Sequence, residues 1–139
     1  MNTWILVADA GSARVFRQEA AILTLVEKFE HPASRHPQHE RVSDRPGRVQ
    51  QGNRGRRSSL EPHTPLEEQA AQEFAVQLSH SLEESLKHRH FDELIVAAPP
   101  HFLGLLRKKF SPHLTKHVVR EFNKDLVQFD ARDLLKHLA

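Results

Sequence analysis

The sequence predicts an α/β domain in which a mixed β-sheet packs against helices. Three patterns support this fold class. Residues 91–110 predict a buried strand, a tight turn and an amphipathic helix, which together form half of a parallel βαβ unit. The first thirty residues predict three strands, and residues 66–90 predict a long helix. A chain of 139 residues suits one such domain, so we expect residues 1–139 to form a single unit.

Three short strands are expected before residue 31. Residues 3–9 form a strongly apolar run, which predicts the first strand. Residues 9–12, Asp-Ala-Gly-Ser, have turn chemistry, because Asp can accept from nearby backbone N–H groups and Gly tolerates positive φ. Residues 14–17 alternate around two apolar side chains and predict the second strand of a hairpin. Residues 23–29 predict a third strand in an antiparallel meander.

The longest helical pattern covers residues 66–90. Thr64 is the expected N-cap, Pro65 suits the first turn, and Glu67 has the spacing of a capping box. The basic cluster at residues 87–90 suits the negative C-terminal end of a helix. Apolar residues recur every three or four positions and predict the face directed at the sheet: Ala70, Ala71, Phe74, Leu78, Leu82 and Leu86.

Residues 94–98 form an unbroken apolar run, which is typical of a strand covered on both faces. Pro99 and Pro100 end this strand, since neither can donate a backbone hydrogen bond, and Pro100 can occupy the first turn of the next helix. That helix should present apolar residues as far as Phe110.

The last thirty residues are less clearly patterned. Ser111-Pro112 predicts a break. Residues 117–127 fit either a helix or a strand, and the β-branched pair Val118-Val119 favours a strand. Asp130 is expected to cap a short C-terminal helix. The predicted order is therefore βββ, a long loop, then α, β, α, β, α.

Residues 31–65 differ from the rest of the chain because large apolar side chains almost disappear. Seven Arg residues stand there against three acidic residues. A connection of this length is functional or disordered, and we expect a partly flexible arm. From residue 45 to residue 57 every cation is an arginine: Arg45, Arg48, Arg54, Arg56 and Arg57.

These five arginines predict contacts with nucleic acid. Arginine presents planar, bidentate donors to phosphate and stacks on bases. Gly47, Gly52 and Gly55 would let the backbone approach a polyanion. Two alternatives stay open: another anionic partner, or a solvated linker whose charge only keeps the chain soluble.

Several strings, in the same order along the chain, resemble the bacterial family of host attachment proteins, said to be required for attachment to host cells. The matching strings are TWILVADAGSARVF, SDRPGR, LEP, FDELIVAAPPHFLGLLRKKF and NKDLV. The resemblance covers essentially the whole chain. The family is similar in turn to the middle domain of archaeal and eukaryotic release factors and of Pelota, so the resemblance implies the ribonuclease H-like layout of that domain. The resemblance to release factors and Pelota implies a binding protein that associates with RNA or the ribosome. The family label implies the alternative, which is attachment to host cells.

In release factors, a loop at the equivalent place carries Gly-Gly-Gln and positions water at the peptidyl-tRNA ester. The corresponding string here is Gln50-Gln51-Gly52-Asn53, which lacks adjacent glycines. Gln51 is the catalytic candidate that this comparison suggests. Because the adjacent glycines are missing, the resemblance does not imply that the chain hydrolyses peptidyl-tRNA. Hydrolysis of peptidyl-tRNA or RNA is the third functional hypothesis, and we expect a binding protein rather than an enzyme.

No metal or cofactor is expected. His31, His36 and His39 have spacing loosely compatible with a metal, but no Cys and no acidic partner at fixed spacing accompany them. The helix from Pro100 lacks a glycine for close approach of a phosphate. A two-metal nuclease would need convergent carboxylates, and each candidate also has a structural role: Asp9, Asp92, Glu93, Asp125 and Asp130.

The sequence favours a cytoplasmic protein. It has no cysteine, which fits a reducing compartment, and no basic region precedes the apolar residues 5–8, so no signal peptide is expected. No apolar run approaches the roughly 20 residues of a membrane span, so no membrane partner is expected. The sequence carries no signal for the oligomeric state.

Overall fold

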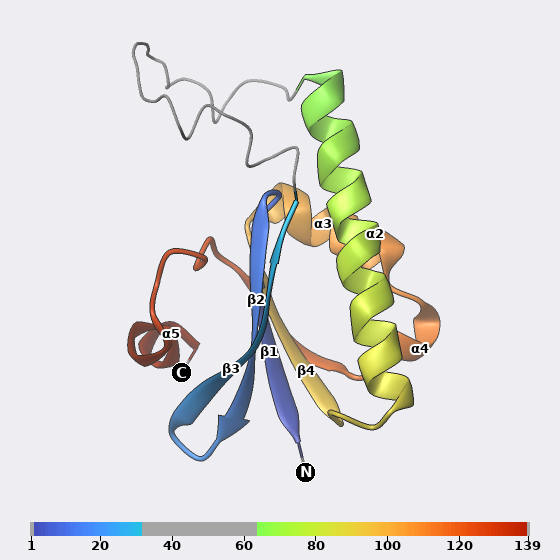
Figure 1. Ribbon diagram of the computed structural model, residues 1–139. Coiled ribbons are helices and arrows are strands. Elements are labelled where there is room, and N and C mark those ends of the chain that lie inside the picture. Colours follow the sequence, from blue (N-terminus) through green and yellow to red (C-terminus); the bar gives the residue numbers. More distant parts are fainter. Residues whose placement is uncertain (1, 32–63, 139) are drawn as a thin grey trace.

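The computed structural model describes residues 2–31 and 64–138. They form a five-stranded mixed sheet in the order β3-β2-β1-β4-β5, with helices on both faces (Figure 1). This arrangement confirms the predicted α/β class. The expected loop over residues 31–65 lies almost entirely outside the described residues.

The N-terminal meander is antiparallel, as predicted. Strands β1 (Thr3–Ala8), β2 (Ser12–Glu19) and β3 (Ile22–Glu30) follow one another in sequence and in space. The Asp9 carboxylate accepts from the backbone N–H groups of Gly11 and Ser12 at 2.8 and 2.9 Å. Asp9 therefore shapes the β1–β2 turn, which is the role its sequence context indicated.

The second half of the sheet is parallel. Strand β4 (Glu93–Ala98) lies beside β1 and is covered on both faces, and β5 (Val118–Asn123) lies beside β4. Within residues 117–127, the strand interpretation is thereby confirmed for residues 118–123. Burial of the apolar β4 run explains why its side chains do not alternate with polar ones.

Among the described residues, three helices cover one face of the sheet and one helix covers the other (Figure 1). Helices α2 (Pro65–Lys87), α3 (Pro100–Lys109) and α4 (Pro112–Thr115) share a core with one face of β1 and β4. Helix α5 (Ala131–Leu138) packs its leucines on the opposite face. The second hydrophobic core lies between α5 and this face of the sheet. Its buried residues include Ile5, Val7, Phe16, Ala97, Leu126 and Leu134.

The predicted helix ends need small corrections. The long helix ends at Lys87, within the basic cluster expected at its end, but Ala70 on its predicted apolar face is only partly buried. The predicted break at Ser111-Pro112 is the start of α4, where the Ser111 side chain accepts from the backbone N–H of Leu114 at 3.0 Å. A helix of four residues is too short to produce a recognisable apolar period. Asp130 caps α5 as expected, accepting from the backbone N–H of Asp133 at 2.9 Å.

Arg14 of β2 fixes the chain that leads into α5. Its guanidinium donates to the backbone carbonyls of Val127 and Phe129, both at 2.5 Å. Partial burial lowers the pKa of Arg14, and the nearby Asp130 carboxylate acts in the opposite direction. The hydrogen-bond donors of Arg14 therefore have a structural role, which is to hold the segment before α5.

None of the described helices combines the length and apolar character needed to cross a bilayer.

Candidate functional site

The described residues on either side of segment 32–63 lie at one end of the molecule, which we call the anchor edge. It is the end at which β1, β3 and β4 finish and at which α2 and α3 begin (Figure 1). Ligands of open α/β sheets commonly bind outside the carboxyl ends of parallel strands, and β1 and β4 are such strands. The anchor edge is therefore the candidate functional site.

His31 fixes the chain where it leaves the sheet. Its backbone N–H donates to the Gly11 carbonyl at 3.1 Å, which ties the end of β3 to the β1–β2 turn. Its ring is buried, meets Phe74 edge-on at 5.8 Å between centroids, and lies 3.4 Å from the Glu73 carboxylate. The residue that precedes segment 32–63 is thus fixed by contacts with the β1–β2 turn and with α2.

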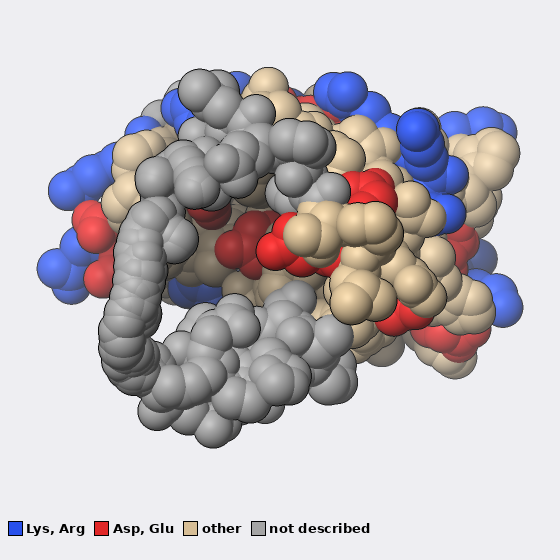
Figure 2. Space-filling view, turned by 90° about the horizontal axis from the view of Figure 1, so that it is seen from above, with Lys and Arg blue, Asp and Glu red and all other residues tan. Residues whose placement is uncertain are grey.

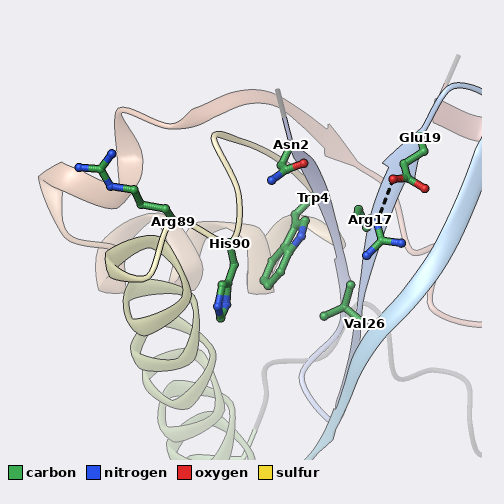
Figure 3. A pocket seen from close by; sticks show the side chains of 7 residues that line it. All are labelled: Asn2, Trp4, Arg17, Glu19, Val26, Arg89 and His90. Carbon is green, nitrogen blue, oxygen red and sulfur yellow. Dashed lines mark ion pairs between the residues drawn. The ribbon is translucent and has the colours of Figure 1, made fainter.

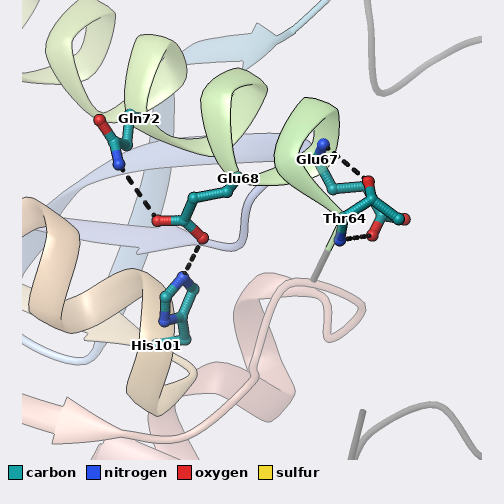
Figure 4. Close-up of polar contacts among 5 residues, drawn as sticks. All are labelled: Thr64, Glu67, Glu68, Gln72 and His101. Atoms are coloured by element: carbon teal, nitrogen blue, oxygen red, sulfur yellow. Dashed lines mark hydrogen bonds and ion pairs between the residues drawn. The ribbon is translucent and has the colours of Figure 1, made fainter. Parts of the chain in front are cut away.

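Thr64 fixes the chain where it returns. Its hydroxyl oxygen accepts from the backbone N–H of Glu67 at 3.1 Å, and the Glu67 carboxylate accepts from the backbone N–H of Thr64 at 3.0 Å (Figure 4). This reciprocal pair is the capping box that the sequence predicted, with Pro65 in the first turn. The two described residues that flank segment 32–63 are consequently held by hydrogen bonds, His31 to the β1–β2 turn and Thr64 to α2.

Replacing Thr64 by Ala should destabilise the protein by about 1 kcal/mol, because the N-terminal turn of α2 loses its side-chain cap. For a chain of this size, the melting temperature should fall by about 3 °C in thermal unfolding followed by circular dichroism. Thr64→Ser keeps the hydroxyl and should melt like the wild type. Equal melting of Thr64→Ala and the wild type would show that the cap contributes nothing.

Glu68 and His101 connect the first turns of α2 and α3. The Nε2 atom of His101 lies 2.7 Å from Oε1 of Glu68, and Gln72 donates to the other carboxylate oxygen at 3.3 Å (Figure 4). An ionised carboxylate can only accept, so with Glu68 ionised the hydrogen bond requires a proton on Nε2 of His101. The pair holds the two helix starts together beside the anchor edge.

Acidic side chains are exposed at this end of the described body. Figure 2 looks down on it and shows Asp and Glu side chains near the centre of the visible described surface, whereas Lys and Arg lie mainly toward the periphery. Segment 32–63 contains seven Arg and three acidic residues, a net charge of +4. The remaining residues contain 13 Lys and Arg against 15 Asp and Glu, a net charge of −2. All of the net positive charge of the chain therefore resides in the segment.

The predicted site residues themselves lie outside the described residues. They are Gln51 as a catalytic candidate and Arg45, Arg48, Arg54, Arg56 and Arg57 as phosphate contacts. Their roles stay predictions, and the structure places only the two anchors between which they occur in the chain.

The carboxylates weighed for a metal-dependent nuclease are not brought together. Asp9 follows the end of β1, whereas Asp92 accepts from the backbone N–H of Asn2 at 2.8 Å, beside the start of the same strand. Asp130 caps α5. Among residues 2–31 and 64–138, no three potential ligands lie close enough to hold a metal ion. His36 and His39 fall outside those ranges.

Sequence reasoning missed a pocket at the opposite end of the sheet. Trp4, Arg17 and His90 contribute to its wall. These residues are far apart in the sequence, and no local pattern links them. The single Trp of the chain, placed in a predicted strand, was the only available signal.

Three comparisons relate the chain to known proteins. A family model described as "Protein required for attachment to host cells" matches residues 4–138. "Uncharacterized protein RP470" of Rickettsia prowazekii (strain Madrid E) is 37% identical over 73 residues, which are 51% of this chain and 49% of that protein. The crystal structure of an archaeal translation termination factor, aRF1, matches with a TM-score of 0.52 at 13% identity, covering 86% of this chain and 29% of that one. The matches thus span about half of the curated relative and under a third of the termination factor, and the second likeness concerns the fold alone.

Proposed function

The chain belongs to the family of proteins required for attachment to host cells, and we propose that its molecular activity is to bind RNA, on the ribosome, through segment 32–63. The observation that carries this proposal is the distribution of charge. The segment has a net charge of +4, whereas the rest of the chain has a net charge of −2. A polyanion is therefore attracted to the segment and repelled by the body.

The chemistry of the segment supports phosphate as the group bound. Its cations are all arginine, which forms bidentate hydrogen bonds with phosphate and stacks on exposed bases. Single-stranded nucleic acid is bound by this combination of positive charge and stacking surfaces. Lysine would supply the charge alone.

The anchors support a binding role for the segment. His31 and Thr64, the described residues on either side of the segment, are fixed to the β1–β2 turn and to α2, so a partner bound by the arginines would be connected to the folded body at two points. The acidic side chains at the same end would not compete for phosphate. A basic segment that is joined to the folded body at both anchors suits a partner that carries many phosphates.

The ribosome is proposed as the source of that RNA because the same fold occurs in a translation termination factor. Hydrolysis of peptidyl-tRNA is not part of the proposal. The segment has Gln51 but no adjacent pair of glycines, and backbone freedom next to the glutamine is what such a mechanism needs.

Fractionation of cells that produce the chain should place it with the ribosomes at low salt. Contacts with rRNA phosphates should be lost as salt rises, so the protein should move from the ribosomal pellet to the supernatant by several hundred millimolar salt.

The second candidate function, direct attachment to a host surface, is favoured by the family description. It predicts that the protein is found outside the cell and absent from the ribosomal pellet at every salt concentration, which would overturn the proposal.

A further inference from the structure

A pocket of about 590 Å³ opens at the end of the sheet opposite the anchor edge. Its wall combines aromatic, apolar and charged groups from β1, β2, β3 and the connection between α2 and β4 (Figure 3). We call it the Trp4 pocket. Its lining residues are Asn2, Trp4, Arg17, Glu19, Val26, Arg89 and His90.

Sheet register creates this combination. Trp4 of β1 is the direct partner of Arg17 on β2, so the two side chains lie next to each other on one face. On β3, Leu25 pairs with Phe16 and Glu27 pairs with Val15, which leaves Val26 as the extra residue of a β-bulge. The bulge directs Val26 to the pocket.

The end of α2 supplies the other wall. Arg89 adopts a left-handed conformation, with φ of 62°, and reverses the chain after the helix. His90 then lies 6.2 Å from Trp4 between ring centroids, while Phe91 stacks on Trp4 at 4.9 Å. The guanidinium of Arg89 points away from Trp4, whereas the exposed His90 ring borders the pocket (Figure 3).

Arg17 is partly exposed, with 42% of its side-chain surface accessible, and it forms an ion pair with Glu19. Its Nε atom is buried and makes no hydrogen bond, the only such side-chain nitrogen or oxygen among the described residues. The Glu19 carboxylate is 3.6 Å away, which is too long for a hydrogen bond. Because much of the guanidinium is accessible and it lines the pocket, its N–H groups can donate to an acceptor that a ligand supplies.

We propose that the Trp4 pocket binds a single unpaired nucleobase, with guanine preferred. Guanine offers O6 and N7 as neighbouring acceptors, which match the forked donors of Arg17. Its N1–H and exocyclic amino group lie next to O6 and match the two acceptor oxygens of Glu19. The base stacks on His90 and contacts Trp4 and Val26, a mode typical of unstacked bases in single-stranded RNA.

This inference deepens the proposed function and rests on it, since it assigns a second RNA contact at the far end of the sheet. The arginines of segment 32–63 would contact phosphates without regard to sequence, and the Trp4 pocket would add preference for a base. The two contacts use different residues, so they can be tested separately.

Trp4 fluorescence reports on the pocket directly, because the chain has one Trp and no Tyr. Titration of the intact protein with GMP should give a saturable change in emission, and AMP should require at least about ten times more ligand. Arg17→Gln should weaken the GMP response at least about tenfold, and Glu19→Gln should remove the preference over AMP. Arg120→Gln, the same substitution on an exposed residue of β5, should respond like the wild type.

Three results would overturn the inference: no saturable response to GMP, an unchanged response in a folded Arg17→Gln protein, or the same response to inorganic phosphate alone. The Arg54, Arg56 and Arg57 triple Ala variant should keep the GMP response while losing RNA affinity. If GMP has no effect but RNA binding is salt-dependent, the pocket assignment fails alone. If GMP binds but the intact chain binds no RNA, the proposed function fails and the pocket stands.

Discussion

The triple variant with Arg54, Arg56 and Arg57 changed to Ala should bind single-stranded RNA about 100-fold more weakly than the wild type at about 0.1 M salt. Each arginine that contacts a phosphate releases about 0.7 counterions from a single strand, which corresponds to about fivefold in affinity at this salt concentration. Three lost contacts multiply to the expected factor. The measurement is fluorescence anisotropy of a labelled oligonucleotide.

The matched control removes the same charge from the body of the protein. Lys108, Lys109 and Lys116 are exposed near the end of α3 and just after α4, and their joint replacement by Ala should change RNA affinity by less than about threefold. The triple arginine variant should also lower the salt slope by about 2. If both variants weaken binding equally, net charge alone attracts the RNA and the segment has no particular role.

Replacing Phe74 by Ala should destabilise the protein by about 3–5 kcal/mol, several times the loss expected for Thr64→Ala. Phe74 is fully buried in the middle of α2. Its ring lies 5.9 Å from Phe102 of α3 and 5.8 Å from His31 at the end of β3, measured between centroids. Its loss leaves a cavity where two helices and the sheet meet.

Urea unfolding followed by circular dichroism measures this change. Val76 lies on the same helix but is 41% exposed, so Val76→Ala serves as the control and should shift stability by less than about 0.5 kcal/mol. A loss below about 1 kcal/mol for Phe74→Ala would mean that the anchor edge is not held by this aromatic contact.

The regular parts of the fold could be predicted from the sequence because local and tertiary preferences agree in them. In α2, the spacing of apolar residues, the Thr64 cap and Pro65 all indicate the same helix start, and the structure confirms it. Residues 117–127 were ambiguous because β5 is an edge strand whose exposed residues do not alternate clearly. Residues 118–123 form a strand because they pair with β4, and a local sequence pattern cannot show this pairing.

The candidate sites could be predicted only where the signal is continuous in sequence. The arginines of segment 32–63 stand out because seven fall within 32 residues. The Trp4 pocket depends on the β1–β2 register, on the bulge at Val26 and on the reversal at Arg89, so its residues converge only in the folded chain. A buried donor without a partner, such as Nε of Arg17, likewise becomes visible only once packing is known.

The most direct test of the central claim is the salt dependence of RNA binding by the purified intact chain. Five arginine–phosphate contacts predict that the logarithm of affinity falls against the logarithm of salt concentration with a slope of about −3.5. Between about 50 and 200 mM salt, affinity for a single-stranded oligonucleotide should therefore fall about 100-fold. A slope near zero, or no binding at about 50 mM salt, would contradict the assignment of segment 32–63 as a phosphate-binding element.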